Sequence, residues 1–250
     1  IQLNSPAARD ANLQIADRLV REAASQGARL VVLPEKWSAL SERPEAEPAD
    51  GPVLTWARDT ARELGIDLVA GSVTLAGEPL PANACVHVGP DGEDRAIYRK
   101  IHMFDSRVGG RAYRESAHEA PGEDVVVSSL PDGTGLGLAV CYDLRFPELF
   151  RAVARRADLL VVIANWPAAR RAHWDLLLRA RAVENLAFVV GVNRTGEGGG
   201  LSYDGGSAAW SAWGEALPAV SSDPAIVEVN PAEVAATRKK YPFLDDIELL

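Results

Sequence analysis

Short unbroken apolar runs alternate along the chain with segments whose apolar residues recur every three to four positions. The segment 8–26 has helical spacing, and the apolar run Leu30–Leu33 follows it. Such runs are typical of strands covered on both faces, so the pair predicts a helix and then a buried strand. The alternation predicts further helices at 53–64, 147–157, 173–186 and 231–241, and strands at 66–73, 125–130, 135–140, 159–164, 187–192, 207–213 and 226–229.

Turn residues predict the remaining connections. Asp91-Gly92 lies between strand-like runs at 84–88 and 96–100, which indicates a hairpin. The segment 104–122 has no sustained period and is expected to be an irregular loop. Residues 1–4 are expected to continue a strand whose first part is absent.

Covered strands interleaved with helices predict an α/β fold. The periodicity alone allows either two sheets packed face to face with helices outside, or one doubly wound sheet. No repeat of fixed period and no low-complexity tract occurs in the 250 residues. We therefore expect a single domain over residues 1–250.

Composition narrows the class of protein. The formal net charge of −9 excludes the basic excess that a nucleic-acid-binding protein needs. Cys85 and Cys141 are the only cysteines, too few for a disulfide framework, so a reducing cytoplasm is expected. No apolar stretch approaches the roughly 18 residues of a membrane span, and no secretory leader is visible, so no membrane partner is expected.

Three ionisable residues occur at or near the ends of apolar stretches. Cys141 follows the run 135–140 and precedes a turn rich in polar residues, Glu35 follows Leu30–Leu33, and Lys100 ends the run 96–100. The sequence therefore predicts that a thiol, a carboxylate and an ammonium group meet at one rim of a sheet. That combination suits acyl transfer through a cysteine nucleophile.

Each residue also has a simpler interpretation. An isolated cysteine at a strand end, such as Cys141, is usually a buried thiol, and a lone loop glutamate is usually solvated. Cys85 lies inside the strand-like run 84–88, where we expect a buried, inert thiol. A zinc enzyme is disfavoured because the four histidines and two cysteines form no HExxH or CxxC spacing. GxSxG, GxGxxG and P-loop motifs are also absent, so neither a metal nor an organic cofactor is expected.

Three motifs resemble the nitrilase superfamily of carbon-nitrogen hydrolases: LVVLPEKW around Glu35, YRKIHMFD around Lys100 and GLAVCYDLRFPELFR around Cys141. The resemblance implies a four-layer αββα sandwich. It also implies that Cys141 is the nucleophile, Glu35 the general base and Lys100 the electrophilic partner of the reacting carbonyl. Members commonly form homodimers near the segment that corresponds to residues 147–157, so a homodimer or higher homo-oligomer is expected.

The resemblance extends to a second glutamate. Glu115 is similar to the residue that many members place beside the lysine, with Glu119 and Glu123 as rivals. Strand alternation puts Arg99 and Lys100 on opposite faces, and the family motif selects Lys100.

Candidate substrate-binding residues follow the strand ends. Tyr142 and Trp166 are expected to form pocket walls, with Trp37 as a weaker candidate. Arg145 is expected either to bind a substrate carboxylate or to pair internally with Asp143 or Glu148. His173 is expected to line the pocket or to be structural, and the competing carboxylate ligands are Arg107, Arg111 and Arg114.

The stretch 164–194, which begins ANWPAARRAHW, resembles the omega-amidase branch. This likeness implies a small-molecule amide substrate, such as 2-oxoglutaramate. Alternative substrates are deaminated glutathione, an N-carbamoyl amine and a nitrile. A non-catalytic member that binds a small acid is the remaining alternative.

Overall fold

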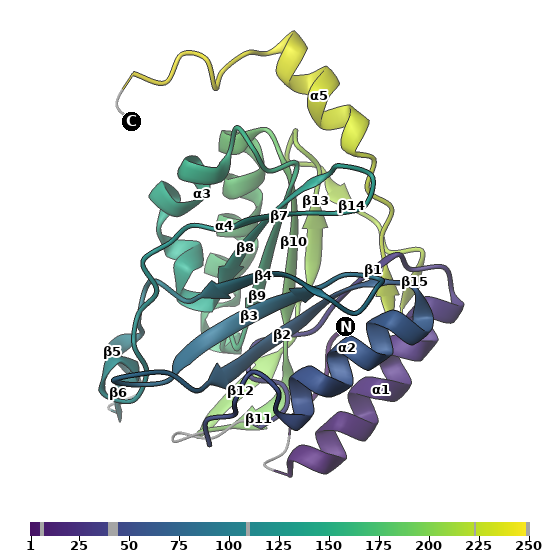
Figure 1. Cartoon of the computed structure of the whole chain (residues 1–250). Coiled ribbons are helices and arrows are strands. Elements are labelled where there is room, and N and C mark those ends of the chain that lie inside the picture. Colours follow the sequence, from purple (N-terminus) through teal and green to yellow (C-terminus); the bar gives the residue numbers. More distant parts are fainter. Residues whose placement is uncertain (6–7, 40–44, 109–110, 223, 249–250) are drawn as a thin grey trace.

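Two β-sheets pack face to face, with helices outside each sheet (Figure 1). The computed structural model describes residues 1–5, 8–39, 45–108, 111–222 and 224–248. The first sheet has the order β1-β2-β3-β4 and the second the order β14-β13-β10-β9-β8-β7. Their strands are β1 (Leu30–Val32), β2 (Asp67–Leu75), β3 (Ala82–Val88), β4 (Asp94–Arg99), β7 (Val127–Ser129), β8 (Gly135–Val140), β9 (Leu159–Ala164), β10 (Phe188–Asn193), β13 (Ala208–Trp210) and β14 (Ala216–Leu217).

The helices form the two outer layers. α1 (Arg9–Ser25) and α2 (Pro52–Leu64) pack on the first sheet through one apolar cluster. α3 (Pro147–Val153) and α4 (Arg171–Asn185) pack on the second sheet, and a second cluster joins them to the space between the sheets. The predicted four-layer αββα sandwich is therefore confirmed, and the doubly wound alternative is wrong.

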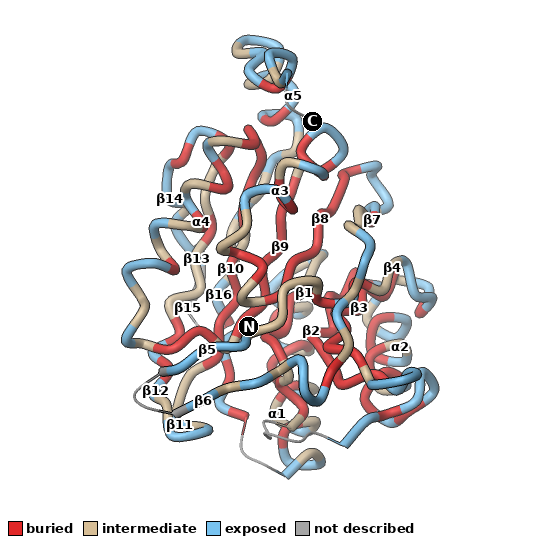
Figure 2. Tube along the Cα trace, turned by 90° about the vertical axis from the view of Figure 1, so that its left-hand side faces the viewer, coloured by how far each residue is buried: buried red, intermediate tan, exposed pale blue. Residues whose placement is uncertain are grey.

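Three central strands of the second sheet run parallel. β8 pairs with β9, and β9 with β10, so that Val140 lies opposite Ile163 and Ala164 opposite Asn193. Every residue of β8 and β9 is buried, as the red tube in Figure 2 shows. Because parallel strands end at the same edge, the residues that follow β8, β9 and β10 meet there.

Short elements complete the chain. They are β5 (Asp105–Val108), β6 (Arg111–Arg114), the 3-10 helices η1 (Glu115–Ala117), η2 (Cys141–Arg145) and η3 (Ala168–Arg170), β11 (Thr195–Gly198), β12 (Leu201–Asp204), β15 (Ser221–Ser222), β16 (Ala225–Ile226) and α5 (Pro231–Lys240). The predicted Asp91-Gly92 turn is present between β3 and β4, with Gly92 in the left-handed region at φ 79°.

Some predicted elements were wrong in detail. The segment 104–122 is not wholly irregular, because β5 and β6 pair as an antiparallel hairpin. α3 ends at Val153, and the residues that follow form a turn. Residues 1–4 form no strand; instead the amino group of Ile1 donates to the carbonyl of Val32, and the carbonyl of Leu3 accepts from the N–H of Thr195.

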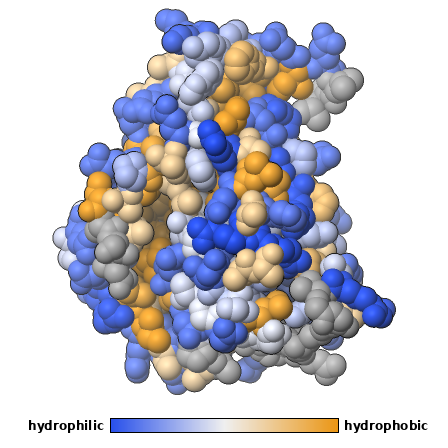
Figure 3. Space-filling view, turned by 180° about the vertical axis from the view of Figure 1, so that it is seen from behind, coloured by the Kyte–Doolittle hydropathy of each residue, from blue (hydrophilic) through white to orange (hydrophobic). Residues whose placement is uncertain are grey.

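Hydrophobic and hydrophilic residues are mixed in small groups on the rear face of the molecule (Figure 3). Among the helices in the described part of the chain, none combines the length and the apolar character that a membrane span requires.

Candidate active site

Cys141 lies at a sharp turn directly after β8. It is the first residue of η2 and has φ 49°, a left-handed conformation that is unusual for a residue with a side chain. The buried carboxylate of Asp143 holds this turn, accepting hydrogen bonds from the N–H of Val140 at 2.9 Å and the hydroxyl of Tyr98 at 2.7 Å. Strained backbone of this kind persists only where neighbouring contacts enforce it.

Glu35 follows β1 on a loop that is also constrained. The next residue, Lys36, has φ 45°, and its N–H donates to the Ser72 hydroxyl at 3.1 Å. Gly71 lacks the Cβ that would collide with the carbonyl oxygen of Pro34, so β2 can approach this loop closely. Only 5% of Glu35 is exposed, which means that the carboxylate is held inside the protein.

Lys100 joins the two predicted carboxylates. Its Nζ lies 2.9 and 2.8 Å from the oxygens of Glu115 and 3.4 Å from Oε1 of Glu35. Lys100 is 2% exposed, whereas Arg99 is exposed on the other face of the strand. Strand alternation therefore places the two side chains as predicted.

Asn83 is a site residue that the sequence analysis missed. Its Nδ2 donates to Oε1 of Glu35 at 2.9 Å and to Oε1 of Glu115 at 3.2 Å. The available signal was a polar residue, fully buried in the structure, within the mostly apolar run ANACVHV that forms β3. Buried amides need partners, so a polar residue at such a position indicates a polar network.

Asn165 connects Glu35 to Cys141. Its backbone N–H donates to Oε2 of Glu35 at 2.8 Å, and its carbonyl lies 3.9 Å from Sγ of Cys141. Asn165 is the first residue after β9, next to the end of β8. The parallel ends of β8 and β9 therefore place Asn165 beside Cys141, and Asn165 in turn contacts Glu35 from the first sheet.

The electrostatics of Cys141 depend on the whole cluster. Burial raises the pKa of the thiol well above its usual range, the Glu35 carboxylate raises it further, and the Lys100 ammonium opposes both effects. The resting residue is therefore a thiol that needs a base.

The positive charge of Lys100 and the negative charge of Glu115 stabilise each other. Burial alone would lower the pKa of Lys100, but the carboxylates of Glu115 and Glu35 outweigh it and raise that pKa. Burial also acts to raise the pKa of Glu115, yet the charges of Lys100 and Lys36 lower it to about 2. The lysine is therefore cationic and Glu115 anionic at neutral pH.

A second buried ion pair lies beside this cluster. Nζ of Lys36 is 2.7 Å from Oε2 of Glu119, whose other oxygen accepts from the Thr74 hydroxyl at 3.0 Å. Of the three glutamates considered, Glu115 is therefore the one that contacts Lys100, while Glu119 pairs with Lys36 and Glu123 is exposed. The sequence analysis missed Lys36.

The predicted substrate-binding residues lie around Cys141 on several elements. Tyr142 packs edge-on against Phe104, with ring centroids 5.1 Å apart. Trp166 is buried, and the Arg145 guanidinium lies 4.9 Å from the centroid of its ring. A nitrogen of Arg145 lies 3.3 Å from Nδ1 of the exposed His173.

Two of these expectations need correction. Within the described residues Arg145 has no ion pair with Asp143 or Glu148, because Asp143 is occupied by the hydrogen bonds of the turn and of His102. Trp37 is fully buried and donates to the carbonyl of Ala70, so it is a core residue and not a pocket wall.

Cys85 and His87 lie on β3 and make no hydrogen bond to Glu35, Lys100, Glu115 or Cys141 in the described structure. Cys85 is fully buried, and burial raises the pKa of its thiol. His87 lies 2.7 Å from the Ser128 hydroxyl and 3.1 Å from Oδ1 of Asp67, in the space between the sheets. In the described ranges, no group of three or more histidine, cysteine, aspartate or glutamate side chains could hold a metal ion.

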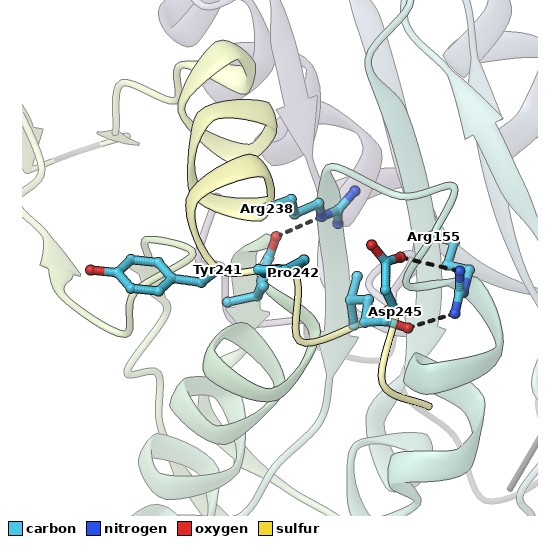
Figure 4. A pocket seen from close by; sticks show the side chains of 7 residues that line it. Arg155, Arg238, Tyr241, Pro242 and Asp245 are labelled. Carbon is cyan, nitrogen blue, oxygen red and sulfur yellow. Dashed lines mark hydrogen bonds and ion pairs between the residues drawn. The ribbon is translucent and has the colours of Figure 1, made fainter. Parts of the chain in front are cut away.

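A cavity of about 260 Å³ under the C-terminal tail is separate from this cluster (Figure 4). Arg155 and Asp245 form an ion pair at 3.5 Å in its wall, to which Arg238 and Tyr241 also contribute. Its lining contains no cysteine, serine or histidine. The cavity therefore lacks a thiol such as that of Cys141.

Comparison with known proteins finds relatives that match nearly the whole chain. An omega-amidase from Homo sapiens is 34% identical, over 97% of this chain and 91% of its own length. A deaminated glutathione amidase from Synechocystis is 35% identical, over 93% of this chain and 91% of its own length. The crystal structure of a CN-hydrolase superfamily protein from Xanthomonas campestris, with an arsenic adduct in its active site, matches with a TM-score of 0.86 and 32% identity, covering 100% of this chain and 95% of that one.

The sequence model of the family described as carbon-nitrogen hydrolase matches residues 1–239. This match covers nearly the whole chain and all the clustered residues described above. The chain belongs to the carbon-nitrogen hydrolase family.

Proposed function

We propose that this protein is a cysteine-dependent amidase that converts a small carboxamide to a carboxylate and ammonia. The single observation that carries the proposal is the buried Lys100 ammonium between the carboxylates of Glu35 and Glu115. Cys141 is connected to this group through Asn165, which contacts both Cys141 and Glu35. A thiol, a base and a fixed positive charge together match the needs of acyl transfer.

In the first half-reaction, Sγ of Cys141 attacks the amide carbon while Glu35 takes the thiol proton. The carbonyl oxygen becomes negative, and the Lys100 ammonium stabilises it, with the backbone N–H of Tyr142 as a second donor. The C–N bond then breaks, and Glu35 returns the proton to the leaving ammonia. A thioester on Cys141 remains.

In the second half-reaction, Glu35 takes a proton from water, and the resulting hydroxide attacks the thioester. The C–S bond breaks, the proton returns to Cys141, and the carboxylic acid leaves. Glu115 and Asn83 hold Lys100 and Glu35 in position through both steps. No step in this scheme is routed through a metal or an organic cofactor.

The proposed substrate is an omega-amide such as 2-oxoglutaramate. The similarity to an omega-amidase supports this choice, as does the Arg145 guanidinium, which pairs with no carboxylate of the described chain. An arginine in that state suits a substrate carboxylate. The deaminated glutathione amidase relative favours deaminated glutathione as the second candidate. The homodimer expected from the sequence stays a prediction.

A substrate panel tests the proposal. It compares 2-oxoglutaramate, glutamine, deaminated glutathione, an N-carbamoyl amine and a simple nitrile, by the release of ammonia or amine. For the wild-type protein we expect the highest kcat/KM with 2-oxoglutaramate. For Cys141→Ala we expect no detectable turnover of any substrate. A strong preference for the nitrile would overturn the amidase assignment, and a preference for deaminated glutathione would replace the proposed substrate.

A further inference from the structure

Two arginines that point toward aromatic rings beside the Cys141 cluster have no acidic partner in the described parts of the chain. Arg145, from η2, lies over the ring of Trp166 at 4.9 Å. Arg170, the last residue of η3, lies over the ring of Phe104 at 5.2 Å. Both side chains are partly exposed, so a small molecule can approach them. The sequence analysis considered Arg145 and did not consider Arg170.

The two aromatic residues, Phe104 and Trp166, contact or adjoin residues of the catalytic cluster. The N–H of Phe104 donates to Oε2 of Glu115 at 2.7 Å, and its ring contacts Tyr142, the neighbour of Cys141. Trp166 follows Asn165 in the chain, and its indole N–H donates to the carbonyl of Arg170 at 2.8 Å. Each guanidinium group therefore lies over the ring of a residue that contacts Glu115 or adjoins Asn165 in the chain.

The charges of the site make these arginines significant. The cluster contains three carboxylates, those of Glu35, Glu115 and Glu119, and two ammonium groups, those of Lys36 and Lys100. An anionic substrate that approached this cluster alone would meet a net negative charge. Arg145 and Arg170 also lie close enough for their charges to repel, an effect that adds to burial in lowering the pKa of Arg145. A bound anion would relieve that repulsion.

We propose that Arg170 joins Arg145 in binding the carboxylate of the substrate, and that Arg170 determines the preference for an anionic amide over a neutral one. The inference rests on the proposed amidase function. Guanidinium groups suit this task because they offer paired N–H donors to a carboxylate. Stacking on Phe104 and Trp166 restricts the side chains before the substrate binds, which reduces the entropy lost on binding.

A matched pair of substrates tests the role of Arg170. Succinamate and butanamide are amides of similar length, and only succinamate carries a carboxylate. With Arg170→Gln we expect kcat/KM for succinamate to fall about tenfold to 100-fold, mainly through KM. For butanamide we expect less than about a twofold change, because the catalytic cluster is untouched.

Arg179→Gln is the matched control. Arg179 also lies over an aromatic ring, that of Trp210 at 5.6 Å, and has no ion pair in the described structure. Trp210 pairs with Val189 near the start of β10, at the strand end away from the cluster. This variant should leave both substrates unchanged. Arg170→Lys, which keeps the charge but loses the paired donors, should recover only part of the succinamate activity.

Equal losses of kcat/KM for both substrates, or no loss for succinamate, would overturn the role of Arg170. Calorimetric titration with succinate provides a second test that needs no turnover. The wild-type protein should bind succinate about tenfold or more tightly than Arg170→Gln. If the wild-type protein hydrolysed neither amide but bound succinate in this Arg170-dependent way, the result would overturn the proposed amidase function and support the proposed anion site. Equal affinity of both proteins for succinate would overturn the proposed anion site.

Discussion

The backbone N–H of Asn165 donates a hydrogen bond of 2.8 Å to Oε2 of Glu35, although the two residues are 130 positions apart in the chain. The carbonyl of the same asparagine lies 3.9 Å from Sγ of Cys141. The residue that follows β9 therefore holds the proposed base and the proposed nucleophile on either side of itself. This contact joins the two sheets, because Glu35 follows the first sheet and Cys141 the second.

Alkylation should distinguish the two cysteines. Cys85 is fully buried, so we expect iodoacetamide to modify only Cys141 and to abolish amidase activity in a one-to-one ratio. Because burial raises the pKa of Cys141, the thiolate fraction and the alkylation rate should rise about tenfold per pH unit between about pH 7 and 9. Peptide mass spectrometry locates the label, and Cys85→Ala is the control. Labelling of Cys85 before Cys141, or an alkylation rate of Cys141 that does not depend on pH, would contradict this assignment.

Replacing Lys100 should remove one stabilising charge from the transition state. For Lys100→Gln we expect kcat to fall by about 10²-fold to 10³-fold, the usual cost of one such donor. Steady-state ammonia release measures the change, and circular dichroism checks that the variant is folded. Arg99→Gln changes the exposed neighbour and should behave as wild type. If both variants lost activity equally, the effect would belong to the strand and not to the ammonium group.

Glu115 should make the protein sensitive to acid. The pKa of Glu115 is lowered from 4.5 to about 2 in the folded protein. The ionised carboxylate therefore stabilises the fold fully above its unfolded pKa of 4.5, and this stabilisation is lost as the pH falls toward 2. The corresponding stabilisation is on the order of 3 kcal/mol. Urea unfolding between about pH 6 and 3 should show a weaker acid dependence in Glu115→Gln than in wild type. Glu123→Gln, at an exposed position, should keep the wild-type slope; the same slope in all three proteins would refute the coupling.

Asp143 should stabilise the turn that carries Cys141. It accepts from the N–H groups of Val140 and His102 and from the hydroxyl of Tyr98, and it is fully buried. Asp143→Ala leaves these donors without an acceptor, so we expect a loss of about 3 kcal/mol in the free energy of unfolding. Tyr98→Phe removes one donor and should cost about 1 kcal/mol. An Asp143→Ala variant as stable as Tyr98→Phe would contradict this account of the turn.

Sequence patterns predicted the main elements because burial on two faces leaves unbroken apolar runs. β8 and β9 have the predicted bounds, and Glu35 and Lys100 do come together. Periodicity could not distinguish one sheet from two, since it records only that a strand is covered and not which layer covers it. Here the motif resemblance supplied the correct choice.

Contacts between distant segments were the part that periodicity could not predict. Asn83 is recognisable only as a polar residue in a buried strand, and its two carboxylate partners become apparent only when the sheets are packed. Lys36 and Arg170 are charged residues in or beside loops, where solvated side chains are common. Their importance depends on Glu119 and Phe104, which lie far from them in the chain.

The most direct test of the central claim is the rate of ammonia release by Cys141→Ala on the best substrate of the panel. If Cys141 is the nucleophile, kcat should fall by at least about 10⁴-fold, as happens when a covalent catalyst is removed. Cys85→Ala should keep the wild-type rate. A folded Cys141→Ala protein with turnover within about tenfold of wild type would contradict the thioester mechanism.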